Sequence, residues 1–374
     1  MSRFRLIHGS DLHLSKYLID HINPIEQISS ASARKQGLEA IKHHFISGHS
    51  LWNVLYPSSF SPRTACCLHK SIKEQLGTAD AAVFTGDLAT TGIKGDLEVA
   101  ADFFRGNLPI DWHGADGMVF GSLLDTEAPI FLMPGNHDRF DGWPGYPGIR
   151  PFETHFGPCW DLWSGRGRLG ANNELTRSRS RYACLKKDDR ILLIVFIDFS
   201  HGFISEADSI SGVCGQGYCS ESISSEAALT TETVRNRLLA AHPTSSIGTI
   251  WCTHFPPRFP EIEHSLDLLR ADNLLRAAIS ANVQILLSGH THKRKIYKAI
   301  LDKSVTVFCA GSACGSNIEN NFSYLSYELD VDQDHQVRID QIYEHTWSSR
   351  DRIFVEQNYR DDIYSERGPL LRSE

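Results

Sequence analysis

Five short apolar runs along the chain each stop at a polar turn that carries Asp, Asn or His. In the third of them, Pro134 and Gly135 follow the last apolar residue, and three polar side chains come directly after. Proline and glycine end a strand and permit a tight turn. Open α/β sheets hold their ligands at the carboxyl ends of their strands. The pattern therefore predicts strands that deliver polar residues to one shared site, and the runs lie at 3–9, 81–85, 130–133, 247–252 and 283–287.

Between these runs, apolar residues recur at helical spacing or at strand spacing. The helical spacing predicts helices over 30–48, 64–76, 95–104, 225–241 and 273–281, the fourth capped by Ser224 or Ser225. A continuous apolar run at 191–198 is typical of a strand that is buried on both faces. From residue 304 onward the apolar residues alternate, which predicts antiparallel strands closing a second sheet, at 305–307, 324–329 and 336–343.

Three segments show no regular period. The aromatic stretch 49–64 is predicted to be an insertion near the site mouth, and the Pro/Gly-rich loop 142–148 to lie beside the site. The Ser/Gly-rich stretch 199–224 is predicted to be a long loop that forms a second wall of the pocket. We therefore predict one catalytic domain over 1–350, in which 49–64 and 199–224 are inserted loops or a cap, and a polar tail or interface arm over 351–374.

The overall composition narrows the class of protein. A chain of 374 residues with 41% hydrophobic and 22% charged residues is typical of a globular protein with a large core. The formal net charge of -8 argues against non-specific binding of nucleic acid, which needs a basic face. It does not exclude a phosphate substrate, because bound metal cations would reverse the local field.

The nine cysteines form no Cys-x-x-Cys pair, and several stand in apolar runs. Buried free thiols and a reducing compartment are the expectation. The N-terminus leads straight into a predicted strand, and no apolar run approaches the length of a membrane-spanning helix. The sequence thus predicts a soluble, cytoplasmic protein that does not contact membranes.

The residues at the strand ends suit a dinuclear metal site. Two cations about 3.5–4 Å apart can clamp a phosphoryl group and ionise a bridging water into a nucleophile. Such a site needs a bridging carboxylate with nitrogen and oxygen donors around it, and Asp87 stands alone on its strand as the natural bridge. Because no cysteine occurs in these motifs, Mn, Fe, Zn or Co is expected rather than a soft metal. The predicted ligands are Asp11, His13, Asp87, Asn136, His254, His290 and His292.

This arrangement resembles the calcineurin-like metallophosphoesterase superfamily. The family signature of Asp-x-His, Gly-Asp, Gly-Asn-His-Asp, His and Gly-His-x-His is present in family order, at 11–13, 86–87, 135–138, 254 and 289–292. The resemblance covers roughly residues 3–345. It implies a four-layer α/β/β/α sandwich of two mixed sheets, with the dinuclear site at the sheet edges.

The resemblance also implies a role for each residue. His137 would not bind metal but would protonate the leaving oxygen or stabilise the developing charge, and Asp138 would orient the loop through backbone hydrogen bonds. One metal ion would be held by Asp11, His13, Asp87 and His292, and the other by Asp87, Asn136, His254 and His290.

Within the superfamily, the motifs are most similar to the class III cyclic-nucleotide phosphodiesterase and glycerophosphodiesterase branch. The protein Ser/Thr phosphatases have Gly-Asp-x-x-Asp-Arg-Gly at the second block, and Gly86 to Gly92 lacks that Asp and Arg. The expected function is hydrolysis of a small phosphodiester with a metal-bridging hydroxide as nucleophile. Phosphomonoesterase and nuclease activities remain alternatives, as does a non-catalytic scaffold.

Further residues are candidates for substrate contact. Arg139 and Arg258 directly follow ligand motifs, and their planar guanidinium groups suit bidentate contact with a phosphate. His201 follows the apolar run 191–198 and is a candidate for the pocket lining. The expected partner is a small phosphoester, and a homo-oligomer is left open.

Overall fold

The computed structural model describes most of the chain, and some predicted segments lie outside its described part. The helix predicted at 30–48 and the loop at 142–148 lie outside, as do 49–59, 201–216 and 360–374. The described residues are 3–15, 60–90, 92, 94–109, 112, 120–139, 149–160, 180–200, 217–260, 268–315 and 322–359.

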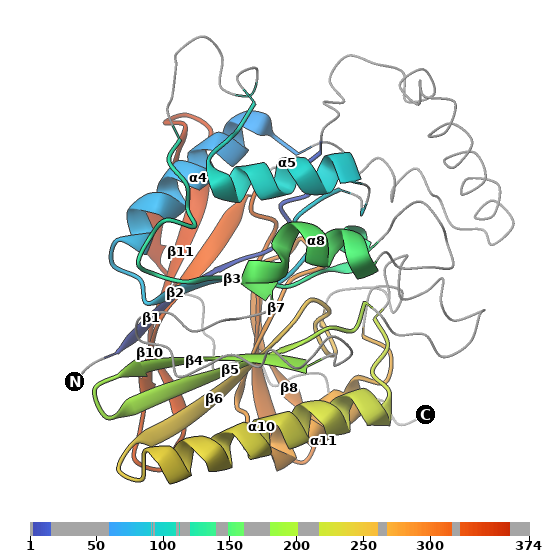
Figure 1. Ribbon diagram of the computed structural model, residues 1–374, viewed down its shortest axis with the longest axis vertical. Coiled ribbons are helices and arrows are strands. Elements are labelled where there is room, and N and C mark those ends of the chain that lie inside the picture. The colour runs from blue at the N-terminus through green and yellow to red at the C-terminus, as the bar shows by residue number, and fades with distance from the viewer. Residues whose placement is uncertain are drawn as a thin grey trace, which may run out of the picture.

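Two six-stranded mixed sheets face each other, and helices cover their outer faces (Figure 1). The first sheet has the order β12 (Ile353–Asn358), β11 (Val337–Ser348), β10 (Ser323–Val331), β1 (Phe4–Gly9), β2 (Ala81–Phe84) and β3 (Ile130–Leu132). The second has the order β4 (Ser180–Lys187), β5 (Arg190–Ile197), β6 (Ser246–Thr253), β7 (Ile285–Ser288), β9 (Ser304–Cys309) and β8 (Lys295–Ile300).

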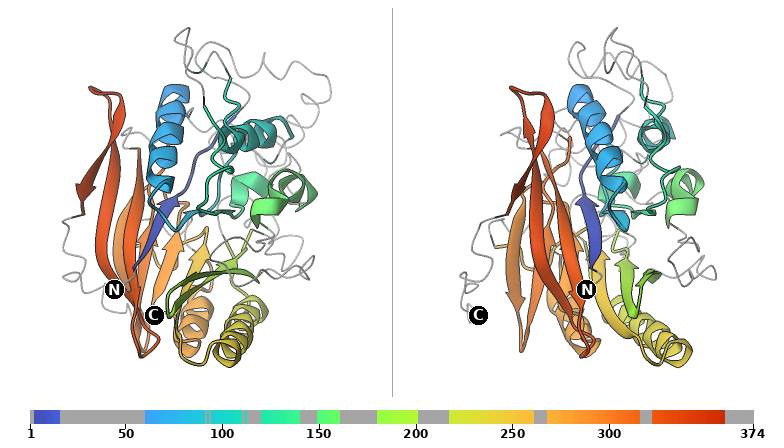
Figure 2. Two further views of the ribbon diagram at one scale, coloured as in Figure 1. Left: turned by 60° about the vertical axis from the view of Figure 1, so that its left-hand side comes forward. Right: turned by 90° about the vertical axis from the view of Figure 1, so that its left-hand side faces the viewer.

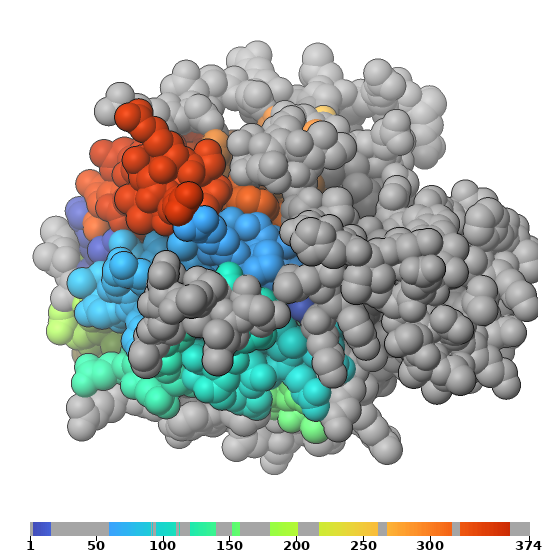
Figure 3. Space-filling model, turned by 90° about the horizontal axis from the view of Figure 1, so that it is seen from above, coloured from blue at the N-terminus to red at the C-terminus, as the bar shows by residue number. Residues whose placement is uncertain are grey.

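The helices form the two outer layers. Against the first sheet lie α4 (Pro62–Leu76), α5 (Lys94–Arg105) and α8 (Ile149–Trp160), and against the second lie α10 (Glu221–Ala241) and α11 (Ala271–Ser280). A short helical turn, α7 (Asn136–Arg139), follows β3. Seen from above, α4 lies between the red strands of the first sheet and α5 (Figure 3). The predicted four-layer α/β/β/α sandwich of two mixed sheets is confirmed.

Each sheet contains a run of neighbouring parallel strands. In the first sheet β1, β2 and β3 are parallel neighbours, and in the second β5, β6, β7 and β9 are. Parallel strands end at the same edge of a sheet, so the polar residues that follow each strand gather there. This topology is the reason that distant parts of the sequence meet at one site.

Strand β5 explains why one apolar run can be continuous. Alternate side chains of a strand point to opposite faces, and Leu192, Ile194 and Phe196 belong to the core between the two sheets. The intervening side chains belong to the core beneath α10 and α11. Phe196 meets Phe131 of β3 with ring centroids 5.7 Å apart, so the two sheets contact each other next to the strand ends. The prediction of a strand buried on both faces is confirmed.

The strands after residue 304 do not all close the second sheet, contrary to the prediction, although β10 and β11 pair antiparallel as expected. β9 pairs parallel with β7 in the second sheet, whereas β10 pairs antiparallel with β1 in the first. Figure 2 shows β1, in dark blue, beside the red strands β10 to β12. Alternation along a sequence indicates strands but not their neighbours, so the periodicity could not assign these strands to a sheet.

Several predicted boundaries are also wrong. Residues 62–64 of the first insertion belong to α4, and residues 221–224 of the second belong to α10. Ser220 caps α10, not Ser224 or Ser225: its Oγ accepts from the N–H of Ile223 at 3.3 Å. The expected tail begins with an edge strand, because β12 pairs antiparallel with β11. Within the described residues, no helix is long and apolar enough to cross a membrane.

Candidate metal centre

The loops after β1 and β2 continue side by side beyond the strands. The N–H of Asp11 donates to the carbonyl of Gly86, and the N–H of His13 to the carbonyl of Asp87, each at 3.0 Å. The side chains of Asp11, His13 and Asp87 are therefore held beside one another, and all three are buried. Residues far apart in the sequence thus form the first part of the site.

The loops of the second sheet close on this group. His254 follows β6, and its carbonyl accepts the N–H of Gly289 at 3.0 Å, which joins it to the loop after β7. The N–H of the next residue, His290, donates to Asp11 Oδ2 at 2.9 Å. Asp11 therefore ties the two sheets together at the site.

Most of the predicted ligands have a left-handed backbone conformation. Such a φ angle is uncommon for residues other than glycine and marks a turn or a functional constraint. Here it lets a sharp turn after each strand aim a polar side chain at a common centre. Five of the seven predicted ligands have it, namely Asp11 (φ 54°), His13 (48°), Asp87 (52°), His290 (72°) and His292 (54°).

The carboxylate of Asp87 lies between two groups of donor atoms. Its Oδ2 is 3.2 Å from His254 Nε2 and 3.7 Å from His13 Nε2. The ligand atoms of Asp11, His13 and His292 lie within 4.8 Å of one another on one side, and those of Asp87, His254 and His290 on the other. This is the geometry that a bridging carboxylate requires.

Donor atoms within each group come close enough to share a cation. On the first side, the Nε2 atoms of His13 and His292 are 2.8 Å apart. On the second, His254 Nε2 is 3.0 Å from Asn136 Oδ1 and 3.3 Å from His290 Nδ1. Imidazole nitrogens with carboxylate or amide oxygens suit Zn, Mn, Fe or Co. The residues therefore form two donor groups, each of which could hold a cation.

Backbone carbonyls set the ring orientation of two histidines. His254 Nδ1 lies 2.7 Å from the carbonyl of Thr85, so it donates there and leaves Nε2 as a metal-competent atom. His137 Nδ1 lies 2.7 Å from the carbonyl of Thr90 in the same way, which leaves Nε2 for other contacts. His137 belongs to a group with His13 and Asp87 whose atoms lie within 4.8 Å of one another. It therefore stands at the edge of the ligand cluster.

Burial and neighbouring charges set the protonation of the ligands. Burial, with His137 nearby, lowers the pKa of His13 to about 3, and burial with His13 lowers that of His292 to about 4. Both are neutral near pH 7, the form that binds a metal. Burial alone would lower the pKa of His254, but the carboxylates of Asp87 and Asp11 outweigh it and raise the value to about 9. A cation that binds there would displace the proton from His254.

Asp138 orients the loop, as expected. Its Oδ2 accepts from the N–H of Gly135 at 2.9 Å and of Leu88 at 3.1 Å, and its Oδ1 from that of Ala89 at 2.8 Å. Burial and the carboxylate of Asp87 raise the pKa of Asp138 to about 7, against these three donors. Asp138 thus joins the loops after β2 and β3 and does not face the ligand cluster.

The structure places the three candidates for substrate contact differently. The Arg139 side chain is fully buried and is bound by Glu153 and Asp198, so the prediction that it contacts a phosphate is wrong. Arg258 donates from Nε and Nη2 to Asp272 of α11 and from Nη1 to the carbonyl of Ile300, so its guanidinium is directed away from the cluster. His201 lies outside the described residues.

Some groups that lie outside the ligand cluster but contact its neighbours were not predicted. Glu153 and Asp198 bind Arg139, and Thr85 and Thr90 supply the carbonyls that orient the histidines. Asp198 could have been predicted from the sequence, because it follows an apolar strand in the way that Asp87 does. The two backbone carbonyls could not have been predicted, since a backbone acceptor is independent of residue type.

Gly135 is required by the close approach of the loop to Asp87. A Cβ atom there would lie 2.5 Å from the Asp87 backbone nitrogen and would overlap Asp87 Oδ1. Gly135→Ala is therefore expected to displace the bridging carboxylate and weaken metal binding by about 10- to 100-fold, as measured by calorimetric titration with Mn²⁺. Gly77→Ala is the control, because a Cβ at that helix end meets only the Glu74 carbonyl, at 3.4 Å. Equal affinities for the two variants would refute the steric argument.

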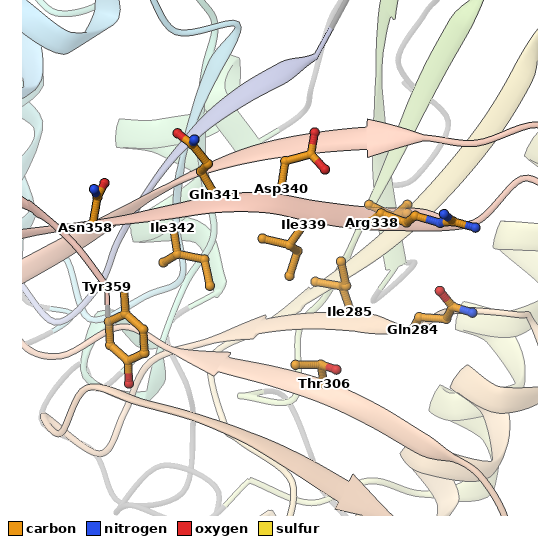
Figure 4. Close-up of a pocket in the computed structure, with 11 residues that line it drawn as sticks. Gln284, Ile285, Thr306, Arg338, Ile339, Asp340, Gln341, Ile342, Asn358 and Tyr359 are labelled. Atoms are coloured by element: carbon orange, nitrogen blue, oxygen red, sulfur yellow. The ribbon is translucent and has the colours of Figure 1, made fainter. Parts of the chain in front are cut away.

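A separate pocket lies away from the predicted ligands (Figure 4). It has a volume of about 610 Å³ and opens between β11 and the beginnings of β7 and β9. Ile339 and Ile342 face Ile285 across it, whereas Asp340 and Gln341 point to the other side of β11. None of the predicted site residues lines it.

The chain belongs to the calcineurin-like phosphoesterase family, because the model of that family matches residues 4–294. No curated protein sequence matches the chain. Among solved structures, it is similar to a dimetal phosphatase from Danio rerio, with 11% identity, a TM-score of 0.49 and coverage of 96% of this chain and 99% of that one. It is also similar to GAP50, the anchor in the inner membrane complex of Plasmodium, with 13% identity, a TM-score of 0.43 and coverage of 96% and 89%.

Proposed function

We propose that this protein is a phosphoric ester hydrolase that uses two metal ions and prefers small phosphodiesters of the cyclic-nucleotide or glycerophosphodiester type. The position of Asp87 Oδ2 carries the proposal, because it lies 3.2 Å from His254 Nε2 and 3.7 Å from His13 Nε2 and so joins the two donor groups. Membership of the calcineurin-like phosphoesterase family supports the reaction class.

Each of the two donor groups combines residues that follow strands of both sheets. Asp11, His13 and His292 would hold one ion and Asn136, His254 and His290 the other, with Asp87 shared. Two such ions supply charge neutralisation for the phosphoryl oxygens and lower the pKa of water. The chain itself provides the buried walls, which strengthen every electrostatic interaction inside the site.

His137 donates a proton to the leaving group. Its Nδ1 is held by the Thr90 carbonyl, so the ring cannot turn and Nε2 is the atom available to the substrate. In the imidazolium form both nitrogens carry a proton: Nδ1–H stays on the carbonyl, and Nε2–H passes to the departing alkoxide oxygen. Thr90 also donates from Oγ1 to the carbonyl of His13, which fixes the acid relative to a ligand.

The preference for diesters rests on charge. A phosphomonoester carries about two negative charges near pH 7, whereas a diester carries a single one, so a monoesterase gains more from cationic side chains at the phosphate. Both arginines next to the ligand motifs, Arg139 and Arg258, are bound by carboxylates elsewhere. The segment from Gly86 to Gly92 also lacks the Asp and Arg found in the protein phosphatases.

The substrate class is tested by comparing two chromogenic esters. With Mn²⁺ added to the metal-free chain, kcat/KM for bis(p-nitrophenyl) phosphate is expected to exceed that for p-nitrophenyl phosphate. Faster cleavage of the monoester would make the protein a phosphatase. Two bound ions without cleavage of either ester would contradict the hydrolase and favour a scaffold.

A further inference from the structure

The metal ligands come from two different sheets, so their spacing depends on how the sheets are held at this edge. Asp87 and Asn136 follow strands of the first sheet, whereas His254 and His290 follow strands of the second. As at the position of Asp11, His13 and His292, the cation position that includes Asn136 therefore draws its ligands from both sheets. Any contact that fixes the α7 turn to the second sheet sets the geometry of that position.

Arg139 makes such a contact. It is the last residue of α7, three positions after Asn136, and its side chain is fully buried. Its Nη2 donates to Asp198 Oδ2 at 2.8 Å, and Asp198 directly follows β5 of the second sheet. Asp198 is itself fixed, because its Oδ1 accepts the N–H of Ser200 at 2.9 Å.

A second carboxylate holds the same guanidinium from the other side. Arg139 Nη1 and Nη2 donate to the two oxygens of Glu153 at 2.7 and 2.9 Å, and Phe152 lies under the guanidinium at 5.2 Å. Glu153 belongs to α8, which packs on β3 of the first sheet. Glu153 therefore links Arg139 to a helix that packs on the first sheet, whereas Asp198 links Arg139 to the end of a strand in the second sheet.

We propose that Arg139 and Asp198 are a positioning pair that fixes Asn136 against His254 and His290, so that this pair determines the affinity of one of the two metal positions. The inference rests on the proposed dinuclear function. A buried guanidinium and carboxylate gain from pairing only in a fixed geometry, and the planar fork of arginine supplies it. The pair acts through Asn136 and touches neither metal nor substrate.

The test distinguishes between the two carboxylates that bind Arg139, those of Asp198 and Glu153. Asp198→Asn removes the charge of the partner in the second sheet, while Glu153 still neutralises Arg139, so the buried charge is not left without a counter-ion. Glu153→Gln is the matched control, because it removes the charge of the partner that lies on the side of the first sheet. Titration of the metal-free full chain with Mn²⁺ is expected to show that Asp198→Asn weakens one of the two sites by about 10- to 100-fold and leaves the other unchanged. Glu153→Gln is expected to retain both affinities.

The visible absorption of bound Co²⁺ provides a second readout that global stability does not determine. Asp198→Asn is expected to change the absorption band of one of the two Co²⁺ ions. Glu153→Gln is expected to change neither band. Unchanged Mn²⁺ affinities in Asp198→Asn, or equal losses in both variants, would overturn the positioning role. Should Asp198→Asn not fold, Arg139→Lys replaces it: the charge stays but the fork is lost, so one site should weaken, and two intact sites would overturn the proposal. Failure of the wild type to bind two Mn²⁺ ions would instead contradict the proposed function.

Discussion

Replacing Asp87 by asparagine is expected to remove both metal ions and to lower hydrolysis by about 10³-fold or more. An oxygen of this carboxylate lies close to nitrogens of both donor groups, namely those of His13 and His254. Asparagine has nearly the same volume but no charge, so the two cations would lose the anion that lies between them. Several kcal/mol of charge stabilisation correspond to a rate factor of this size.

Elemental analysis and the diester assay on the same preparation measure both effects. Asp102→Asn is the control, since Asp102 is a half-buried residue of α5 that pairs with Arg105 three positions on in the same helix. The control is expected to keep two ions and full turnover. An Asp87→Asn protein that retained one tightly bound ion would show that the carboxylate serves one position and does not bridge.

His137→Ala is expected to lower kcat by about 10²- to 10⁴-fold while both metal ions stay bound. His137 stands beside His13 with ring centroids 4.7 Å apart, but its Nδ1 is used by the Thr90 carbonyl. It can therefore donate a proton from Nε2 without being needed as a ligand. The loss should be smaller for an ester with a good leaving group such as p-nitrophenolate, because that oxygen needs less protonation.

Turnover of esters with leaving groups of graded pKa, together with metal content, measures this role. His242→Ala is the matched control, because His242 caps the end of α10, just before β6 begins, away from the strand ends that carry the site. A His137→Ala protein that lost its metal would make His137 a ligand. An equal loss for good and poor leaving groups would exclude the proton-transfer role.

The ligands of the site could be predicted from the sequence because each follows a recognisable strand end. The apolar runs before Asp87 and His254 form parallel strands, and parallel strands bring their carboxyl ends to one edge. The left-handed conformation of Asp11, Asp87 and three of the histidines also agrees with residue type, since Asp and His are enriched in that conformation. Local pattern therefore sufficed to predict which polar residues gather at this edge.

Features that depend on non-local partners could not be predicted in this way. Arg139 looked like a phosphate contact because it follows the Asn136 motif, but its partners Glu153 and Asp198 come from α8 and from the end of β5. Burial by another part of the chain decides such cases, and periodicity does not report it.

The most direct test of the proposed dinuclear site counts metal ions and follows activity in one experiment. Metal-free protein is titrated with Mn²⁺, and hydrolysis of bis(p-nitrophenyl) phosphate is recorded at each step. The arrangement around Asp87 predicts two ions per chain and hydrolysis that rises as the second ion binds. Saturation at one ion, or hydrolysis that does not depend on added metal, would contradict it.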